Sequence, residues 1–267
     1  MFTNRDLRNL IVPLFVEQFL LMLVGLADTF VVSFVGDAAV SGVSLVNAFN
    51  TVFLFLFTAL ASGGAVIISQ YIGSGNNERA GRSAGQLLML SVLSAVALSA
   101  AILLFQRPLL EALFGKVEEP VMEACGIYLR ISAYSFPALA VYNAGAALCR
   151  SIGKTNVTMY ISTAANGINI VGNLVGVFAL GAGVAGVAYP SLIARTLSAA
   201  AVTVYCFAQR LPVRYRRREI FTWDGELLKR VLGIAIPNGV ENGVHQLVKV
   251  ALSSMVALFG TYQIAAN

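Results

Sequence analysis

The sequence has few charged residues, a single histidine and only three cysteines. Charged residues make up 12% of the chain, whereas roughly 25% is usual in soluble domains. Cys125, Cys149 and Cys206 form no C-x-x-C motif, so we expect neither a disulfide nor a cysteine metal site. The chain also lacks a paired-Asp motif, and His245 stands alone. We therefore expect no hydrolytic enzyme and no cofactor chemistry built on these residues.

The sequence is rich in apolar residues. They make up 58% of the chain, and the mean hydropathy is +0.78. A helix needs about 20 apolar residues to cross a bilayer, whereas strands of a membrane barrel would alternate over segments of about 10 residues. The long charge-free runs are 38–77, 83–106, 131–149 and 155–194. The sequence therefore predicts an all-α, polytopic membrane helix bundle, with spans near 9–34, 43–71, 83–106, 125–149, 156–180, 184–209 and 230–259.

Positive charge is concentrated in alternate connecting segments. Cytoplasmic loops carry an excess of Lys and Arg, and here one set of loops holds thirteen of them while the other set holds only Arg107 and Lys116. We therefore expect a protein of the cell (inner) membrane with a cytoplasmic N-terminus. The thirteen are Arg5, Arg8, Arg79, Arg82, Arg150, Lys154, Arg210, Arg214, Arg216, Arg217, Arg218, Lys229 and Arg230.

The basic run Arg214–Arg218 has two interpretations. Such runs occur in nucleic-acid-binding proteins. A polybasic segment next to a membrane span is also attracted to anionic lipid head groups. Because this run lies between two predicted spans, on the expected cytoplasmic side, we favour the lipid interpretation and expect no nucleic-acid partner.

Two connecting segments are longer than the others. Residues 107–124 mix apolar and acidic side chains, which is typical of a short amphipathic helix at the membrane surface. We expect this segment to be a surface connector rather than a gate. Residues 211–229 contain Pro212, Trp223 and several arginines, and are expected to form a cytoplasmic linker between two lobes.

Small residues recur at helical spacing within the spans. They let helix backbones approach one another closely, so they are expected to mark helix–helix contacts. The residues concerned are Gly63, Gly64, Gly172, Gly176, Gly181, Gly183 and Gly186.

Residues 13–36 recur, without a gap, 224 positions later. Eight positions are identical, among them Pro13 with Pro237 and Glu17 with Glu241. A period this long corresponds to a structural half and not to a solenoid repeat. We therefore expect a duplicated fold, with a six-helix N-terminal lobe at 1–210, a linker at 211–229, and the start of a second lobe, including a seventh transmembrane helix, at 230–267.

Ionisable side chains inside the spans are the first candidates for function. Such groups are costly in a bilayer and are retained mainly where they face a cavity or a partner. Asp28 is the strongest candidate for a functional residue, because it lies well inside the first span. Glu17 and its repeat mate Glu241 could belong to the cytoplasmic end of the same pathway.

Three asparagines form a polar stripe along the fifth predicted span. Asn166, Asn169 and Asn173 fall on one helical face, and Asp28 and Asn173 lie at similar depth if their helices face each other. A carboxylate and amide oxygens are ligands for a hard cation, whereas a dehydrated carboxyl group could instead take up a proton. Asparagines also join membrane helices by hydrogen bonding alone. The pattern predicts either a cation or proton site or a structural contact.

Three further residues have a functional and a structural interpretation. Pro13 removes a backbone hydrogen bond, so we expect either a static kink or a hinge linked to Asp28. Arg195 needs an anionic partner or a water-filled cavity, and since Glu17 and Asp28 are the only acids in the first six spans, we expect a structural or gating ion pair with one of them. His245 could titrate near neutral pH or simply pack.

Taken together, these motifs resemble the multidrug and toxic compound extrusion (MATE) family. The resemblance covers the whole chain and depends on the order and spacing of its motifs more than on any one of them. The motifs are Pro13 through Asp28-Thr29 and Gly36, Ser69–Gly73, Arg150–Thr155, Asn169 with Asn173, Gly183–Pro190, and Ile236–Asn242.

The resemblance implies twelve helices in two six-helix lobes, and a hinge at Pro13. It implies export of cationic or amphipathic small molecules in exchange for Na⁺ or H⁺, with that ion as the only cofactor. The implied coupling site consists of Asp28, Asn169 and Asn173, with Asn143 and Ser191 as the nearest matches to two further family positions. In one branch of the family, Asp often stands where this chain has Asn173. The pocket then carries one carboxylate fewer, which leaves the choice between Na⁺ and H⁺ open.

Two alternatives to a drug exporter follow from the same features. One is a flippase for lipid-linked precursors, a function found in the same superfamily. The other is a membrane fragment that does not transport until it meets a partner half. The repeat offset implies a full protein of about twice this length, and a chain that ends at Asn267 is expected to lack the second lobe and hence the cleft between lobes.

Overall fold

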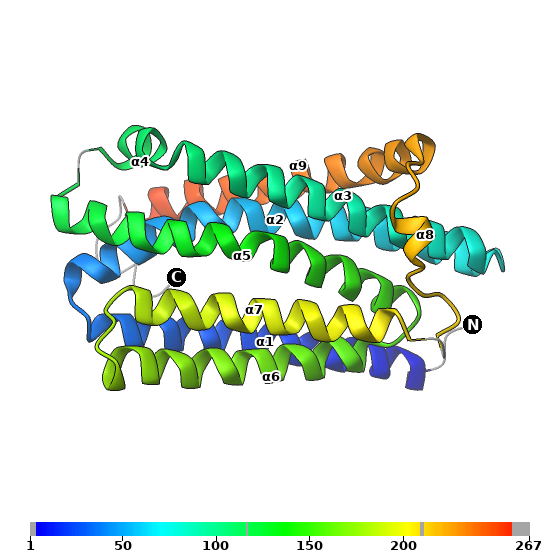
Figure 1. Ribbon diagram of the computed structural model, residues 1–267, viewed down its shortest axis with the longest axis horizontal. Helices are drawn as coiled ribbons and strands as arrows, with labels where there is room; N and C mark the ends of the chain where they lie inside the picture. The colour runs from blue at the N-terminus through cyan, green and yellow to red at the C-terminus, as the bar shows by residue number, and fades with distance from the viewer. Residues whose placement is uncertain (1–3, 116, 209–210, 258–267) are drawn as a thin grey trace.

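The computed structural model describes residues 4–115, 117–208 and 211–257, and over these ranges the chain is built from helices without strands. The long helices run side by side as an elongated bundle (Figure 1). Six of them are long and apolar enough to cross a membrane, which confirms the predicted membrane bundle. These six are α1 (Asn4–Ser33), α2 (Asp37–Gly73), α3 (Asn77–Leu104), α5 (Glu119–Ser151), α6 (Thr155–Leu174, continued by η1, Val175–Ala179) and α7 (Ala185–Cys206).

The segment 107–124 does not form one surface helix as expected. A short helix, α4 (Gln106–Phe114), ends well before residue 124, and Glu119 already begins α5. Pro120 lies in the first turn of α5, where its fixed φ and missing N–H favour helix initiation. The acidic residues of this segment therefore belong partly to the first turns of a membrane helix.

The predicted linker is shorter than expected, because the helix after it begins earlier. α8 (Arg217–Ile220) lies within the linker, and α9 (Gly225–Ala257) begins at Gly225, five residues before the predicted 230. Asp224 explains this start: its Oδ1 accepts the backbone N–H of Leu227 at 3.2 Å, as an N-cap does. α9 corresponds to the predicted seventh span.

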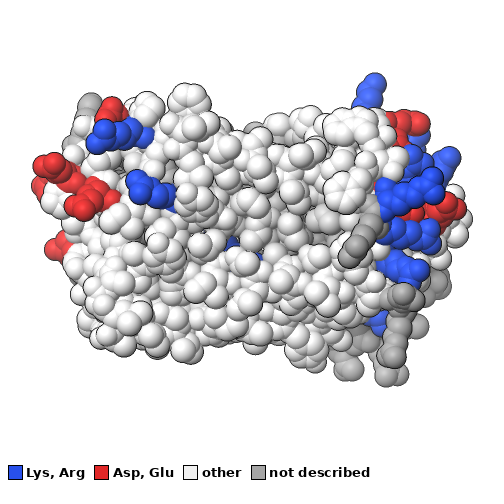
Figure 2. Space-filling model, viewed as in Figure 1, with Lys and Arg blue, Asp and Glu red and all other residues white. Residues whose placement is uncertain are grey.

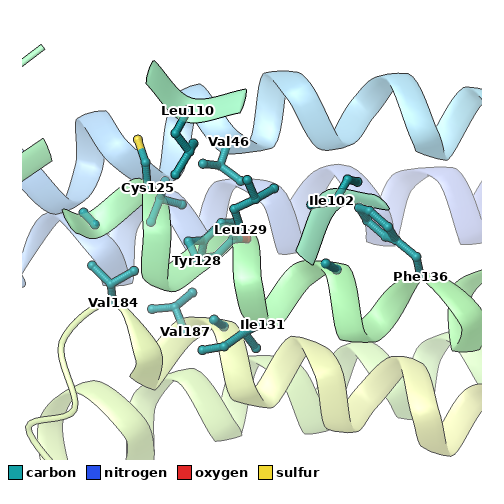
Figure 3. Close-up of a cluster of buried hydrophobic side chains, with 14 of the residues drawn as sticks. Val46, Ile102, Leu110, Cys125, Tyr128, Leu129, Ile131, Phe136, Val184 and Val187 are labelled. Atoms are coloured by element: carbon teal, nitrogen blue, oxygen red, sulfur yellow. The ribbon is translucent and has the colours of Figure 1, made fainter. Parts of the chain in front are cut away.

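Helix α5 is the centre of the bundle. It packs against α2, α3 and α7, and the buried side chains Leu129 and Phe136 of α5 share one apolar cluster with Val46, Ile102 and Val187 of those three helices (Figure 3). α1, in contrast, packs mainly against α6, and α6 in turn packs against α7. The position of α1 relative to the rest therefore depends chiefly on α6.

Glycines allow α6 and α7 to touch backbone to backbone. A Cβ atom on Gly176 would collide with the backbone of Gly186, and one on Gly172 would come within 2.6 Å of Pro190. These glycines therefore mark helix contacts, as do Gly63 and Gly64 against α9 and α3. Gly181 and Gly183 differ from the expectation: with φ of 59° and 57° they form the turn before α7, because this backbone conformation disfavours side chains.

Charged side chains gather at the two ends of the bundle and leave a broad apolar belt between them (Figure 2). The end with the start of α3 and α8 carries Arg79, Arg82, Arg216 and Arg218, and we call it the basic end. The opposite end, at α4 and the start of α5, carries Glu111, Glu119 and Glu123.

We expect Gly176→Ala to destabilise the protein, because the new methyl group meets the backbone of α7, which has no rotamer to change. Overpacking of this kind costs about 1–3 kcal/mol. Gly167→Ala, also in α6, is the control, since nothing lies within 4 Å of its Cβ position. Thermal denaturation in detergent, followed by size-exclusion chromatography, should show a lower melting temperature for Gly176→Ala only. Equal melting temperatures would contradict the tight α6–α7 contact.

Candidate cation site

A carboxylate of α1 and a carboxamide of α6 meet inside the bundle. Asn173 Nδ2 donates a hydrogen bond to Asp28 Oδ1 at 2.5 Å. Asn173 is 1% exposed, whereas Asp28 is half-buried. Because α1 depends on α6 for most of its packing, this hydrogen bond lies at the main contact that holds α1.

The hydrogen bonds continue from Asn173 to α7. Asn173 Nδ2 also donates to Asn169 Oδ1 at 3.2 Å, and Asn169 Nδ2 donates to Ser191 Oγ at 2.8 Å. Ser191 Oγ donates in turn to the carbonyl of Val187 one turn earlier. The structure thus joins Asp28, Asn173, Asn169 and Ser191 across three helices, and we call these four residues the Asp28 cluster.

One oxygen in the Asp28 cluster has no donor. Asn173 Oδ1 is buried, and no hydrogen bond reaches it from the described residues. A buried acceptor without a partner is costly, so its presence calls for an explanation such as an ion. Carboxylate and amide oxygens are the ligands that hard cations prefer, and the cluster supplies both.

The charge of the cluster limits what it can hold. No group of three or more His, Cys, Asp or Glu side chains that could hold a metal lies among the residues the structure describes, and Asp28 is the only carboxylate in the cluster. One negative charge balances one positive charge, so the cluster fits a monovalent cation or a proton better than a divalent metal.

Arg195 does not form the ion pair that we expected. Its Nη1 donates to Ser135 Oγ of α5 at 2.6 Å, and no salt bridge to Asp28 or Glu17 is present. Arg195 lies one turn after Ser191 on α7, and its long side chain reaches the α5 hydroxyl, which itself donates to the carbonyl of Ser132. Arg195 still lies within electrostatic range of Asp28, so its positive charge competes with any cation there.

Glu17 has a partner that the sequence did not suggest. The Tyr142 hydroxyl of α5 donates to Glu17 Oε1 at 2.9 Å, and Glu17 is 6% exposed. Pro13, one turn earlier on α1, is also buried. Tyr142 gave no signal in the sequence, because nothing in a single chain tells which helix Glu17 will face.

The remaining sequence candidates lie outside the Asp28 cluster. Asn143 and Asn166 have buried amide nitrogens without a hydrogen-bond partner in the described residues, and neither is bonded to the cluster. Glu241 is exposed on α9. The side chain of His245 lies outside the described residues.

A turn of π-helix, η1, follows the cluster directly. It covers Val175–Ala179 and begins two residues after Asn173. π turns inside helices are often found at functional sites. Here the turn contains Gly176, whose backbone contacts α7. This contact holds the end of α6 close to α7, where Asn169 hydrogen-bonds Ser191.

A family model described as MatE matches residues 13–175. An uncharacterized transporter of Bacillus subtilis, YisQ, is 29% identical over 93% of this chain and 55% of its own length. A probable multidrug resistance protein, NorM of Thermotoga maritima, is 25% identical over 96% of the chain and 55% of its own length. The multidrug and toxin extrusion protein 1 of Danio rerio is 26% identical over 82% of the chain and 36% of its own length.

Solved structures share the fold. A crystal structure of MATE in the bent conformation superposes with a TM-score of 0.86, at 24% identity, and covers 97% of this chain and 58% of that one. A MOP superfamily transporter from Pyrococcus furiosus gives a TM-score of 0.88 at 23% identity, with 97% and 57% covered. The chain therefore spans about half the length of the curated relatives it matches.

We expect Tyr142→Phe to lower the melting temperature, because it removes the hydroxyl that hydrogen-bonds the buried Glu17. Leaving a buried polar group unpaired costs about 1–3 kcal/mol. Tyr160→Phe is the matched control, since Tyr160 is 67% exposed. Thermal denaturation of both variants in detergent provides the comparison, and an unchanged melting temperature for Tyr142→Phe would show that Glu17 does not depend on Tyr142.

Proposed function

Because this chain belongs to the MatE family of membrane transporters, we propose that the whole protein is a secondary active exporter. It extrudes cationic or amphipathic small molecules in antiport with Na⁺ or H⁺. Two curated relatives are named as multidrug proteins, which supports the substrate class. The observation that carries the proposal is the Asp28 cluster, with its single carboxylate and an unpaired amide oxygen inside a membrane bundle.

Occupation of the site changes the contact between α1 and α6. With Asp28 ionised, Asn173 donates to it, and the carboxylate attracts a cation or a proton. A bound cation takes the Asn173 oxygen as a ligand, and a bound proton removes the negative charge that the Asn173 N–H faces. Either event alters a hydrogen bond at the main packing partner of α1.

The contact between α1 and α6 couples ion binding at Asp28 to the position of α1. α1 packs only weakly on α2 and α7, so a change at Asp28 can move it relative to the rest of the bundle. Pro13, where the α1 hydrogen-bond ladder is interrupted, serves as the hinge. The second lobe needed for alternating access begins with α9 in this proposal, in agreement with relatives of about twice this length.

The charge pattern supports an orientation. Lys and Arg favour the cytoplasmic side, so the basic end, with the start of α3 and α8, lies in the cytoplasm together with the N-terminus. The protein is then a multi-pass protein of the cell membrane, and the Asp28 cluster, near the end of α1, lies towards the outer side.

Asp28→Asn in the full-length protein should abolish cation-coupled efflux, because the amide carries no charge to bind the ion. Asp37→Asn, at the exposed first position of α2, should leave efflux intact. Resistance of cells to cationic drugs and the amount of protein in the membrane are the measurements. Normal drug resistance with Asp28→Asn would remove Asp28 from the mechanism.

Asn173→Leu should reduce the initial rate of efflux by about tenfold or more, as expected for loss of a hydrogen bond to a charged group. Asn166→Leu, on the same helix but outside the cluster, is the control. Proteoliposomes of the full-length protein with an imposed Na⁺ gradient, or with an imposed pH gradient, measure the rate and identify the coupling ion. Equal rates for the two variants would contradict a role for the Asn173 amide.

A further inference from the structure

The basic end contains a cavity that the Asp28 cluster does not use. It has a volume of about 580 Å³ and lies between the start of α3 and the segment 216–222. Figure 2 shows Lys and Arg side chains gathered at this end of the bundle. Four of the eight lining residues are arginines, and we call the cavity the arginine pocket; its lining is Asn76, Glu78, Arg79, Arg82, Arg216, Arg218, Glu219 and Thr222.

One buried side chain of α3 hydrogen-bonds the linker segment and so joins the two walls of the arginine pocket. Gln86 of α3 is 0% exposed, and its Nε2 donates to the carbonyls of Glu219, at 2.9 Å, and Thr222. Its Oε1 accepts the backbone N–H of Asp224 at 3.1 Å. Gly85 lets the linker lie directly on α3, since a Cβ there would be 3.1 Å from the Glu219 backbone. The pocket is therefore preformed by packing.

Two of the four arginines already have carboxylate partners. Arg82 Nε lies 3.2 Å from Asp224 Oδ2, and Arg216 Nη1 lies 3.4 Å from Glu219 Oε1. Arg79 and Arg218 form no ion pair with any residue that the structure describes. The pocket thus keeps two guanidinium groups without a carboxylate, next to the positive N-terminal end of α3.

Glu219 contributes a largely buried carboxyl group to the pocket wall. Its Oε2 is buried and receives no hydrogen bond from the described residues, while Oε1 faces Arg216. Burial raises the pKa of the Glu219 carboxyl, against the opposing effect of Arg216.

We propose that the arginine pocket binds a phosphate group, carried either by an anionic lipid head group or by a free phosphate compound. The planar guanidinium fork matches phosphate oxygens in pairs, which makes arginine the preferred residue for this ligand. The pocket lies where the apolar belt ends, the depth at which lipid phosphates are found.

The test uses the full chain, purified in detergent, at constant ionic strength so that general screening does not change. Native mass spectrometry measures the affinity for phosphatidylglycerol against phosphatidylcholine, and inorganic pyrophosphate is added as the free-phosphate probe. The variant Arg79→Gln/Arg218→Gln removes the two unpaired arginines. The control Lys154→Gln/Lys229→Gln removes the same charge from exposed positions outside the pocket.

We expect the arginine double variant to bind phosphatidylglycerol at least about tenfold more weakly, as loss of charge-assisted hydrogen bonds predicts, while the lysine variant changes little. If pyrophosphate binds with the same dependence on Arg79 and Arg218, the site accepts free phosphate. If only the lipid does, the site is a head-group site. Equal weakening in both double variants, or no binding of either probe to the unmodified chain, would overturn the proposal.

Discussion

The hydrogen bond from Asn173 to Asp28 is the contact on which this account depends. It joins α1, which packs mainly against α6, to that helix, and through Asn169 and Ser191 to α7. A carboxylate in this position can exist only with a partner or an ion, because an isolated charge in a bilayer is costly. The same constraint makes the site responsive: whatever binds Asp28 changes the contact that holds α1.

The fold was predictable to the extent that it follows from hydropathy and charge. Charge-free runs located α2, α3, α5, α6 and α7, since a membrane helix must satisfy its backbone internally and present apolar side chains. Boundaries at the ends were less predictable, because they depend on local caps: Pro120 starts α5 and Asp224 starts α9 earlier than hydropathy suggests. The π turn η1 had no signal in the sequence.

The sequence predicted those site residues that are polar within apolar spans. It did not predict which side chains of different helices contact one another. Asp28, Asn169 and Asn173 stand out as polar residues in apolar spans, and the structure brings them together with Ser191. Arg195 was assigned an ionic partner because acids were scarce, but in the structure its guanidinium group donates to the hydroxyl of Ser135. Contacts such as Tyr142 with Glu17, or Gln86 with the linker, join residues more than a hundred positions apart, and no local pattern encodes them.

The most direct measurement is difference infrared spectroscopy of the carboxyl group of Asp28 in the purified protein. Spectra are recorded with and without Na⁺, and across a pH series, with Asp28→Asn to assign the bands. The account predicts a carboxyl or carboxylate band that responds to Na⁺ or to pH and is absent in the variant. If no band that depends on Asp28 responds to either ion, Asp28 is a structural hydrogen-bond partner only, and the central claim is wrong.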